Sequence, residues 1–355
     1  MRERESVIQN ILKISSRILL ILCFFISSLS SFSQRIPVVV HIISDDPDAV
    51  SDASIINAIN DLNDAFAHAG AYGFGAGANT GISFCFANKD PNGGNTNGIT
   101  RTKSVLYDFD VDIEDSKTKN LISWDTKKYL NIWYVTGLKS EIYQNYSCGV
   151  WRRMKEGGYA TFSSGGDYRD GVVVTGFGVL LVHEVGHYLG LKHTFIPENC
   201  NNSDCSVDGD GICDTPPQQV FSGSCLSPQN SCTTDTLSGF ATDQQDMNEN
   251  FMGYSPCANM FTNGQAVKMK DVLATTRNSL LVEDLCAKPC AENILASFTR
   301  NNWFPVPGDV ITFTSTSSGG TNYEWTIDGV PAGSNSAVLT HSFSAIGKYK
   351  VGLKV

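Results

Sequence analysis

Residues 183–193 read HEVGHYLGLKH, and this stretch constrains the fold more than any other part of the chain. His183 and His187 are four residues apart, so on a helix they project from the same face, one turn from each other. Two imidazoles held in this way can bind one zinc ion. Gly190 lets the chain leave the helix sharply, because glycine adopts a left-handed conformation at low cost. The turn can then bring His193 to the metal as a third ligand.

Three nitrogen ligands leave the fourth coordination position of zinc open, which is typical of catalytic rather than structural zinc sites. Glu184 projects one step round the same helix, close enough to reach a water on the metal without being a ligand. The alternative is an ordinary helix with polar exposed positions. Gly190 and His193 make the extended motif far more specific than the bare His-Glu-x-x-His pattern.

A second fragment, NFMGYS at residues 250–255, lies downstream of the histidines. Taken alone, Met252 reads as an ordinary core methionine. Together with the extended zinc motif, the fragment resembles the Met-turn of the metzincin metallopeptidases. The resemblance implies that Met252 forms an apolar floor beneath the zinc site. It also implies that Tyr254 lies near the metal and donates a hydrogen bond to the oxyanion of a tetrahedral intermediate.

Four further segments occur in order with these motifs, and the whole set resembles the pappalysin family, especially its bacterial members. They are residues 35–41, 98–101, 158–162 and 208–216. The resemblance runs from about residue 36 to about residue 285. It implies an α/β (α+β) metzincin catalytic domain with a mixed twisted sheet and an active-site helix.

The resemblance also implies a zinc-dependent endopeptidase. Zinc would lower the pKa of a water, and Glu184 would take its proton and pass it to the leaving amine. One alternative is a secreted adhesin or binding protein that keeps the fold without catalysis. The intact Glu184 argues against this, because a scaffold does not need that carboxylate. A zinc hydrolase acting on something other than peptides is the other alternative.

The N-terminus has the layout of a secretory signal peptide, predicted over residues 1–34. Basic residues precede an apolar run at residues 18–26, and a serine-rich segment follows. The run is short for a permanent membrane helix, so an uncleaved anchor is the alternative and no stable membrane insertion is expected after cleavage. The net charge of −10, without a basic stretch, disfavours a nucleic-acid partner. We expect a secreted or cell-surface protein acting on protein or peptide substrates.

Eleven cysteines occur in the chain, and Cys23 lies in the predicted signal peptide. The remaining even number indicates disulfides in an exported protein. A thiolate zinc site is the alternative, disfavoured because no Cys-x-x-Cys spacing occurs. The family resemblance implies Cys205–Cys232 and Cys225–Cys257, with Cys200–Cys213 as the remaining local pair. Elimination then leaves Cys85–Cys148 and Cys286–Cys290.

An acidic loop follows the zinc motif and contains Asp208, Asp210, Asp214 and Thr215. Hard carboxylate oxygens grouped in one loop are typical calcium ligands. An EF-hand beginning at Asp204 would need glutamate where Thr215 stands, so that motif fails. The family resemblance still implies structural calcium near this loop, and a solvated acidic turn is the alternative.

Two domains are expected after the signal peptide: a metallopeptidase domain over residues 35–290 and a small β-sandwich over residues 295–355. The second region is rich in Thr, Ser, Gly and aromatic residues, resembles a polycystic-kidney-disease (PKD) type module, and has Trp325 as its expected core residue. Alternating and helical hydrophobic spacing predicts the elements of the first domain. The expected strands are residues 36–43, 82–87, 130–135 and 171–174; the expected helices are residues 54–68, 177–190 and 262–277, the last opened by a capping box.

Overall fold

The computed structural model describes residues 34–140, 154–155, 157–162, 167–195, 200, 203–220, 228–281, 285–286, 296–317 and 322–355. The predicted signal peptide lies outside these residues except for Gln34, which begins the first strand. No helix in the described part of the chain is long and apolar enough to cross a membrane.

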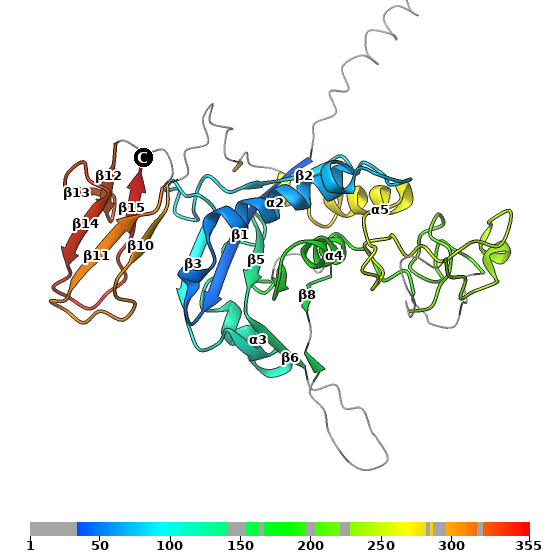
Figure 1. The fold of residues 1–355 in the computed structure, drawn as a ribbon, viewed down its shortest axis with the longest axis horizontal. Coiled ribbons are helices and arrows are strands. Elements are labelled where there is room, and N and C mark those ends of the chain that lie inside the picture. Colours follow the sequence, from blue (N-terminus) through cyan, green and yellow to red (C-terminus); the bar gives the residue numbers. More distant parts are fainter. Residues whose placement is uncertain are drawn as a thin grey trace, which may run out of the picture. The chain divides into compact units, whose positions relative to one another are not determined.

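A mixed sheet organises the first domain (Figure 1). Its path is β2 (Ile82–Phe86), β1 (Gln34–Ser44), β5 (Leu130–Tyr134), β9 (Val172–Val174) and β8 (Gly158–Ala160), with β3 (Ile99–Lys103) paired to β1 off this path. Strands β3, β1, β5 and β9 run parallel, whereas β8 runs antiparallel to β9. Strand β8 therefore ends the sheet path, next to the strand that leads into the metal-motif helix.

The main core lies between this sheet and two helices, α2 (Asp52–Ala67) and α4 (Val179–Tyr188). Successive side chains of a strand point to opposite faces, and β1 follows this rule. Val38, Val40 and Ile42 pack in the cluster shared with the helices, whereas Ile43 belongs to a cluster on the other side. The expected strands and helices of this domain are confirmed to within a few residues, and so is the mixed α/β fold class.

Several elements were not predicted, because their hydrophobic spacing is weak. They are the sheet strands β3 and β8, α3 (Val111–Lys119), β4 (Asp108–Asp110), β6 (Gly137–Ser140), β7 (Met154–Lys155) and the short 3₁₀ turns η1 (Pro47–Ala49), η2 (Gly70–Tyr72), η3 (Asp235–Ser238) and η4 (Asn278–Leu281). Helix α3 has a charged sequence and starts at a local cap. The backbone N–H of Asp112 donates to the Asp110 carboxylate at 3.0 Å. Such a cap stabilises a helix that has no clear apolar stripe.

The last helix of the first domain, α5 (Asn263–Ala274), opens with the predicted capping box. The Gln265 backbone N–H donates to the Thr262 hydroxyl at 3.1 Å, and the Gln265 side-chain oxygen accepts from the Thr262 N–H at 2.9 Å. Two backbone groups that a helix start leaves without partners are satisfied reciprocally. The box fixes where the chain turns after the Met252 fragment.

The C-terminal region forms two antiparallel three-stranded sheets, which confirms the predicted small β-sandwich. One sheet has the order β10 (Phe298–Arg300), β11 (Val310–Ser315), β14 (Val338–Ser342), and the other β13 (Val330–Ala332), β12 (Glu324–Ile327), β15 (Val351–Lys354). Trp325 is 2% exposed and packs with Ile311, Phe313 and Leu339. Its indole N–H donates to the Ser336 carbonyl at 2.8 Å. Trp325 is the core residue that the sequence predicted, and the PKD-type resemblance stays a prediction.

The long-range disulfide joins Cys85 to Cys286, so the predicted pairs Cys85–Cys148 and Cys286–Cys290 are wrong. Ala87 forms an antiparallel bridge with Cys286, and the Asn88 side chain donates to the Cys286 carbonyl at 2.7 Å. This pairing brings Cys286 beside β2. Elimination along the sequence could not find it, because the two cysteines are 201 residues apart.

The cysteine-dense loop pairs Cys200 with Cys232 and Cys205 with Cys213. The predicted bonds Cys205–Cys232 and Cys200–Cys213 are therefore wrong. Left-handed Gly209 (φ 62°) and Gly211 (φ 81°) turn the chain back between Cys205 and Cys213, whose Cα atoms lie 4.8 Å apart. Cys257 is disulfide-bonded, whereas Cys225, its predicted partner, lies outside the described residues.

His41 is a fully buried histidine in β1 whose position in the sequence offers no partner at metal-ligand spacing. Its ring lies between the Thr100 hydroxyl, 2.7 Å from Nδ1, and the Asn131 side-chain oxygen, 2.9 Å from Nε2. The Asn131 amide nitrogen donates to the Trp124 and Tyr129 carbonyls, so its oxygen must accept from His41 Nε2–H. Nδ1 then accepts from Thr100, and burial lowers the pKa of His41 to about 4.

We expect this histidine to make the fold sensitive to acid. Because the folded pKa of about 4 lies below the ordinary 6.5, the contribution of His41 is full above pH 6.5 and is lost as pH falls towards 4. The loss is about 1.4 kcal/mol per pH unit, and about 3 kcal/mol in all. In urea unfolding, His41→Gln should be less stable than wild type at pH 7, with a gap that closes by that amount near pH 4. A gap independent of pH would contradict the assignment.

Candidate metal centre

Helix α4 carries the metal motif, and its apolar residues fix its orientation. Leu181, Val182 and Val185 are fully buried in the main core. Gly190 follows the helix with φ 88°, as predicted, and reverses the chain. A Cβ at Gly190 would lie 2.8 Å from a methyl group of Val272 on α5, so only glycine fits there. The turn brings His193 back to the helix.

The structure brings His183, His187 and His193 together, with candidate ligand atoms within 4.8 Å of one another. Nε2 of His193 lies 3.2 Å from Nε2 of His183 and 3.0 Å from Nε2 of His187. Two nitrogens bound tetrahedrally to one zinc, each at ~2.0–2.1 Å, lie ~3.3 Å apart. The spacing of the three nitrogens therefore fits a single zinc ion. Among the described residues, this is the one group of histidine, cysteine and carboxylate side chains that could hold a metal.

Backbone carbonyls set the orientation of the two helical histidines. Nδ1–H of His183 donates to the Phe251 carbonyl at 2.6 Å, and Nδ1–H of His187 donates to the Leu191 carbonyl at 2.7 Å. Each Nε2 is then unprotonated and directs its lone pair at His193. The single Nε2 of His193 can donate at most one hydrogen bond, so it cannot satisfy both lone pairs. A cation placed between the three nitrogens would accept all of their lone pairs.

Burial keeps these imidazoles neutral at neutral pH. Removal from water lowers the pKa of His183, lowers that of His187 to about 4 and lowers that of His193 to about 3, and the neighbouring rings add to the last two shifts. A neutral imidazole is the form that binds a metal. The site is therefore prepared for a cation without prior loss of protons.

Glu184 is 5% exposed and lies on α4 where strand β8 passes the helix. A Cβ added to Gly158, the first residue of β8, would lie 3.0 Å from Cγ of Glu184 and 2.8 Å from the Val173 carbonyl. Glycine at this position thus allows the edge strand to pass close to the carboxylate. Glu184 lies within the same turn of α4 as the two histidines.

Met252 and Tyr254 both lie against the metal motif. Met252 is fully buried, and a Cβ at Gly186 of α4 would lie 2.5 Å from its sulfur, so the thioether packs directly on the helix. Tyr254 is 58% exposed, with its ring centroid 4.7 Å from that of His193 and 5.7 Å from that of His183. The Met252 fragment thus supplies both an apolar support and an exposed phenol beside the histidines.

Two aromatic residues next to the histidines were not predicted. The Phe195 ring stacks on His193 with centroids 4.6 Å apart, and it is 5% exposed. Phe162, just after β8, lies 5.1 Å from the His187 ring and is 48% exposed. The position of Phe195 two residues after His193 was a usable signal, whereas nothing in the sequence ties Phe162 to His187. Both rings shield the imidazoles from water.

The acidic loop is organised by hydrogen bonds of its own. The Asp214 carboxylate accepts from the Thr262 hydroxyl and the Gly264 N–H, each at 2.7 Å, and so ties the loop to the start of α5. Asp210 is 9% exposed, accepts from the Thr215 hydroxyl at 2.8 Å, and burial raises its pKa to about 7. Asp208 accepts from the Ser203 hydroxyl at 3.0 Å. These contacts leave calcium a prediction of the family resemblance.

Two histidines on a helix, a third brought back to them by a turn, and a buried carboxylate on the same helix, in a mixed α/β domain, define a site of the metallopeptidase class. Comparison with known proteins agrees. Residues 112–274 match the Peptidase_M43 family, described as pregnancy-associated plasma protein-A. This segment matches the model of that family, the pappalysins, which confirms the resemblance read from the motifs.

Individual relatives and solved structures are consistent with this family. An extracellular metalloprotease of Arthroderma otae is 39% identical over 94 residues, which is 26% of this chain and 30% of that protein. Extracellular metalloprotease 1 of Coccidioides posadasii is 37% identical over 97 residues, 27% of this chain and 30% of its own length. The matches thus span about a third of these relatives. Mature mirolysin of Tannerella forsythia, solved with a cleaved peptide, is similar in structure with TM-score 0.54 and 28% identity, covering 72% of this chain and 99% of that one.

Proposed function

We propose that the protein is a secreted zinc-dependent endopeptidase. The observation that carries the proposal is the convergence of three histidine Nε2 atoms. Two of these histidines are oriented by backbone carbonyls and lie on α4 with the buried carboxylate of Glu184. His183, His187 and His193 would hold the ion. The names of the fungal relatives support export, because they are called extracellular metalloproteases.

Zinc, when bound, supplies Lewis-acid chemistry that polarises a carbonyl and lowers the pKa of a water. The chain itself does the rest. Strand β8 ends the sheet path, so an extended peptide can add to it by backbone pairing and lie across α4. Glu184, close to Gly158 of that strand, takes the proton of the attacking water and returns it to the leaving amine. Phe162 and Phe195 exclude water from the rings that they cover.

Tyr254 is proposed to donate its hydroxyl hydrogen to the oxyanion that develops during the attack. Tyr254→Phe removes this donor and keeps the ring that packs against His193. A donor of this kind is worth ~3–4 kcal/mol, so kcat should fall by ~10²–10³. Zinc content and melting temperature should hardly change.

The matched control is Tyr168→Phe, which removes a hydroxyl from another exposed tyrosine, 45% accessible, that has no role in the proposed chemistry. It should leave kcat unchanged. If kcat is unchanged in Tyr254→Phe, Tyr254 only packs against the histidines. If the variant loses zinc instead, Tyr254 supports metal binding, and its role as an oxyanion donor is wrong.

Calcium remains part of the proposal, at the loop that contains Asp208, Asp210, Asp214 and Thr215. The supporting observation is that Asp210 is a buried carboxylate whose raised pKa a bound cation would lower. Structural calcium should raise the melting temperature of the zinc-loaded protein. No rise with millimolar calcium would count against the site.

The competing candidate is a binding protein that keeps the fold without catalysis. A digest of a random peptide library by the full chain, with and without a zinc chelator, separates the two. The proposal expects internal peptide bonds to be cut, and cutting to stop when the chelator is added. An intact library in the presence of a zinc-loaded protein would favour the binding protein.

A further inference from the structure

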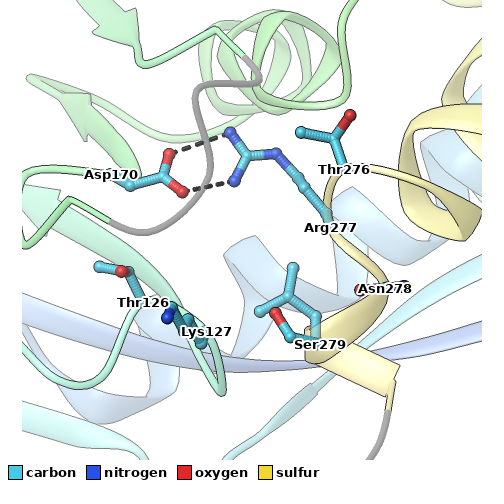
Figure 2. A pocket seen from close by; sticks show the side chains of 8 residues that line it. Thr126, Lys127, Asp170, Thr276, Arg277, Asn278 and Ser279 are labelled. Atoms are coloured by element: carbon cyan, nitrogen blue, oxygen red, sulfur yellow. Dashed lines mark hydrogen bonds and ion pairs between the residues drawn. The ribbon is translucent and has the colours of Figure 1, made fainter.

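Arg277 is a buried cation behind the candidate metal centre, between α5 and η4. Its side chain is 2% exposed, and the side chain of its partner Asp170 is 1% exposed. Figure 2 shows the guanidinium facing the Asp170 carboxylate in a two-pronged contact. Nη1 donates to one carboxylate oxygen at 2.6 Å and Nη2 to the other at 2.9 Å. The family match ends at residue 274, so it does not include Arg277.

The same guanidinium also holds two backbone carbonyls. Nε donates to the Tyr188 carbonyl at 2.8 Å, and Nη2 donates to the Thr161 carbonyl at 3.0 Å. The guanidinium carbon lies 3.5 Å from the centroid of the Tyr188 ring. A planar fork with several N–H groups in fixed directions can make all these contacts at once, which an ammonium group cannot.

The segments that Arg277 joins are those that build the proposed active site. Tyr188 ends α4 and directly follows His187, so its carbonyl is one that a helix end leaves without a partner. Thr161 follows the edge strand β8 and precedes Phe162, whose ring contacts His187. Asp170 precedes β9, the neighbour of β8. One side chain thus ties the end of the metal helix to the exit of the edge strand.

We propose that Arg277 is a positioning residue that sets the edge strand β8 against α4. A peptide paired with β8 then presents its carbonyl in register with Glu184 and the histidines. This inference rests on the proposed peptidase function. A buried ion pair is a weak source of stability, because the cost of removing both charges from water offsets their attraction. The contribution of Arg277 is instead the fixed geometry of its hydrogen bonds to the Asp170 carboxylate, the Tyr188 carbonyl and the Thr161 carbonyl.

A cavity beside the guanidinium gives a small molecule access to the position of the Arg277 side chain. It has a volume of about 280 Å³ and is lined by Arg277, Asp170, Thr126, Lys127, Ser279 and neighbouring residues (Figure 2). Truncating Arg277 extends this cavity towards the two carbonyls and the carboxylate. A small planar guanidinium ion added to the buffer can then occupy the vacated position.

The experiment uses the full zinc-loaded chain and two substrates with one scissile bond: a long peptide found in the wild-type digest, and a shortened, end-blocked version that cannot extend along β8. The readout is the ratio of kcat/KM for the long peptide to that for the short one. This ratio does not depend on the fraction of folded enzyme. Arg277→Ala should lower it by at least ~10-fold, because a misplacement of ~1 Å can cost ~10²-fold. Zinc content should be unchanged.

Chemical rescue and a matched variant complete the design. Guanidinium at non-denaturing millimolar concentration should raise the ratio in Arg277→Ala, and ethylammonium should not, because it lacks the planar fork. The matched control is Arg169→Ala, which removes an arginine that is 48% exposed and pairs with Asp167 on the surface. It should keep the wild-type ratio.

The outcomes separate this inference from the proposed function. An unchanged ratio in Arg277→Ala, or equal rescue by ethylammonium, overturns the positioning role while the peptidase function stands. Zinc loss in that variant also overturns it, because the effect would then act on the metal ligands. If Arg277→Ala does not fold, Arg277→Lys keeps the charge without the fork and should show the same fall; an unchanged ratio there refutes the inference. A zinc-loaded wild type that cuts no peptide in the library digest refutes the proposed function, and this inference with it.

Discussion

Glu184→Gln is expected to keep zinc and lose peptide cleavage. The amide has almost the shape of the carboxylate, so the packing around this 5% exposed side chain is retained. It cannot accept the proton of the attacking water, and kcat should therefore fall by about 10²–10⁴-fold. The measurement is steady-state cleavage of one peptide from the library digest, with zinc content measured on the same samples.

The control for this variant is Glu249→Gln, which neutralises an exposed carboxylate close in sequence to the Met252 fragment. It should retain wild-type kcat. Full activity in Glu184→Gln would remove Glu184 from the mechanism. Zinc loss there would mean that this carboxylate supports the metal, and the role given to it would be wrong.

His193→Ala is expected to remove zinc binding. The three histidines contribute one nitrogen each, and two ligands on α4 alone form an incomplete site. Wild-type protein at zinc concentrations of ~100–1,000 times Kd should gain about 2.7–4.1 kcal/mol of stability from the metal. His193→Ala should gain almost none and should have no activity. Thermal melts with and without zinc provide the measurement.

His341→Gln is the matched control, because His341 lies on strand β14 of the C-terminal sandwich and contacts Phe343. This variant should show the full wild-type stabilisation by zinc. If His193→Ala still binds zinc with wild-type affinity, His193 is not a ligand and the three-histidine site is wrong.

The metal motif was predictable from sequence because its geometry is local. His183 and His187 are one helical turn apart, and Gly190 marks a left-handed turn that any helix ending in this way requires. The capping box at Thr262 and Gln265 is local for the same reason. Strands such as β1 were predictable because their buried runs bear β-branched residues.

The rest depended on contacts between distant segments. Cys85 lies beside Cys286 because Ala87, just after β2, bridges to Cys286. Loop turns bring Cys205 to Cys213 rather than to Cys232. Arg277 carried no signal beyond its position near a helix end, because its partners come from α4, from the exit of β8 and from the entry to β9. A sequence pattern gives the spacing of residues along the chain and does not show which distant segments come into contact.

The most direct test of the zinc-peptidase account is a titration of metal-free full chain with zinc, following cleavage of one peptide. The account predicts no cleavage at the start, a linear rise with added zinc, and a sharp break at about one zinc per chain, which the three-histidine site requires. Glu184→Gln should bind the same amount of zinc without the rise in cleavage. Cleavage by the metal-free chain, or one bound zinc per chain without any cleavage by wild type, would contradict the account.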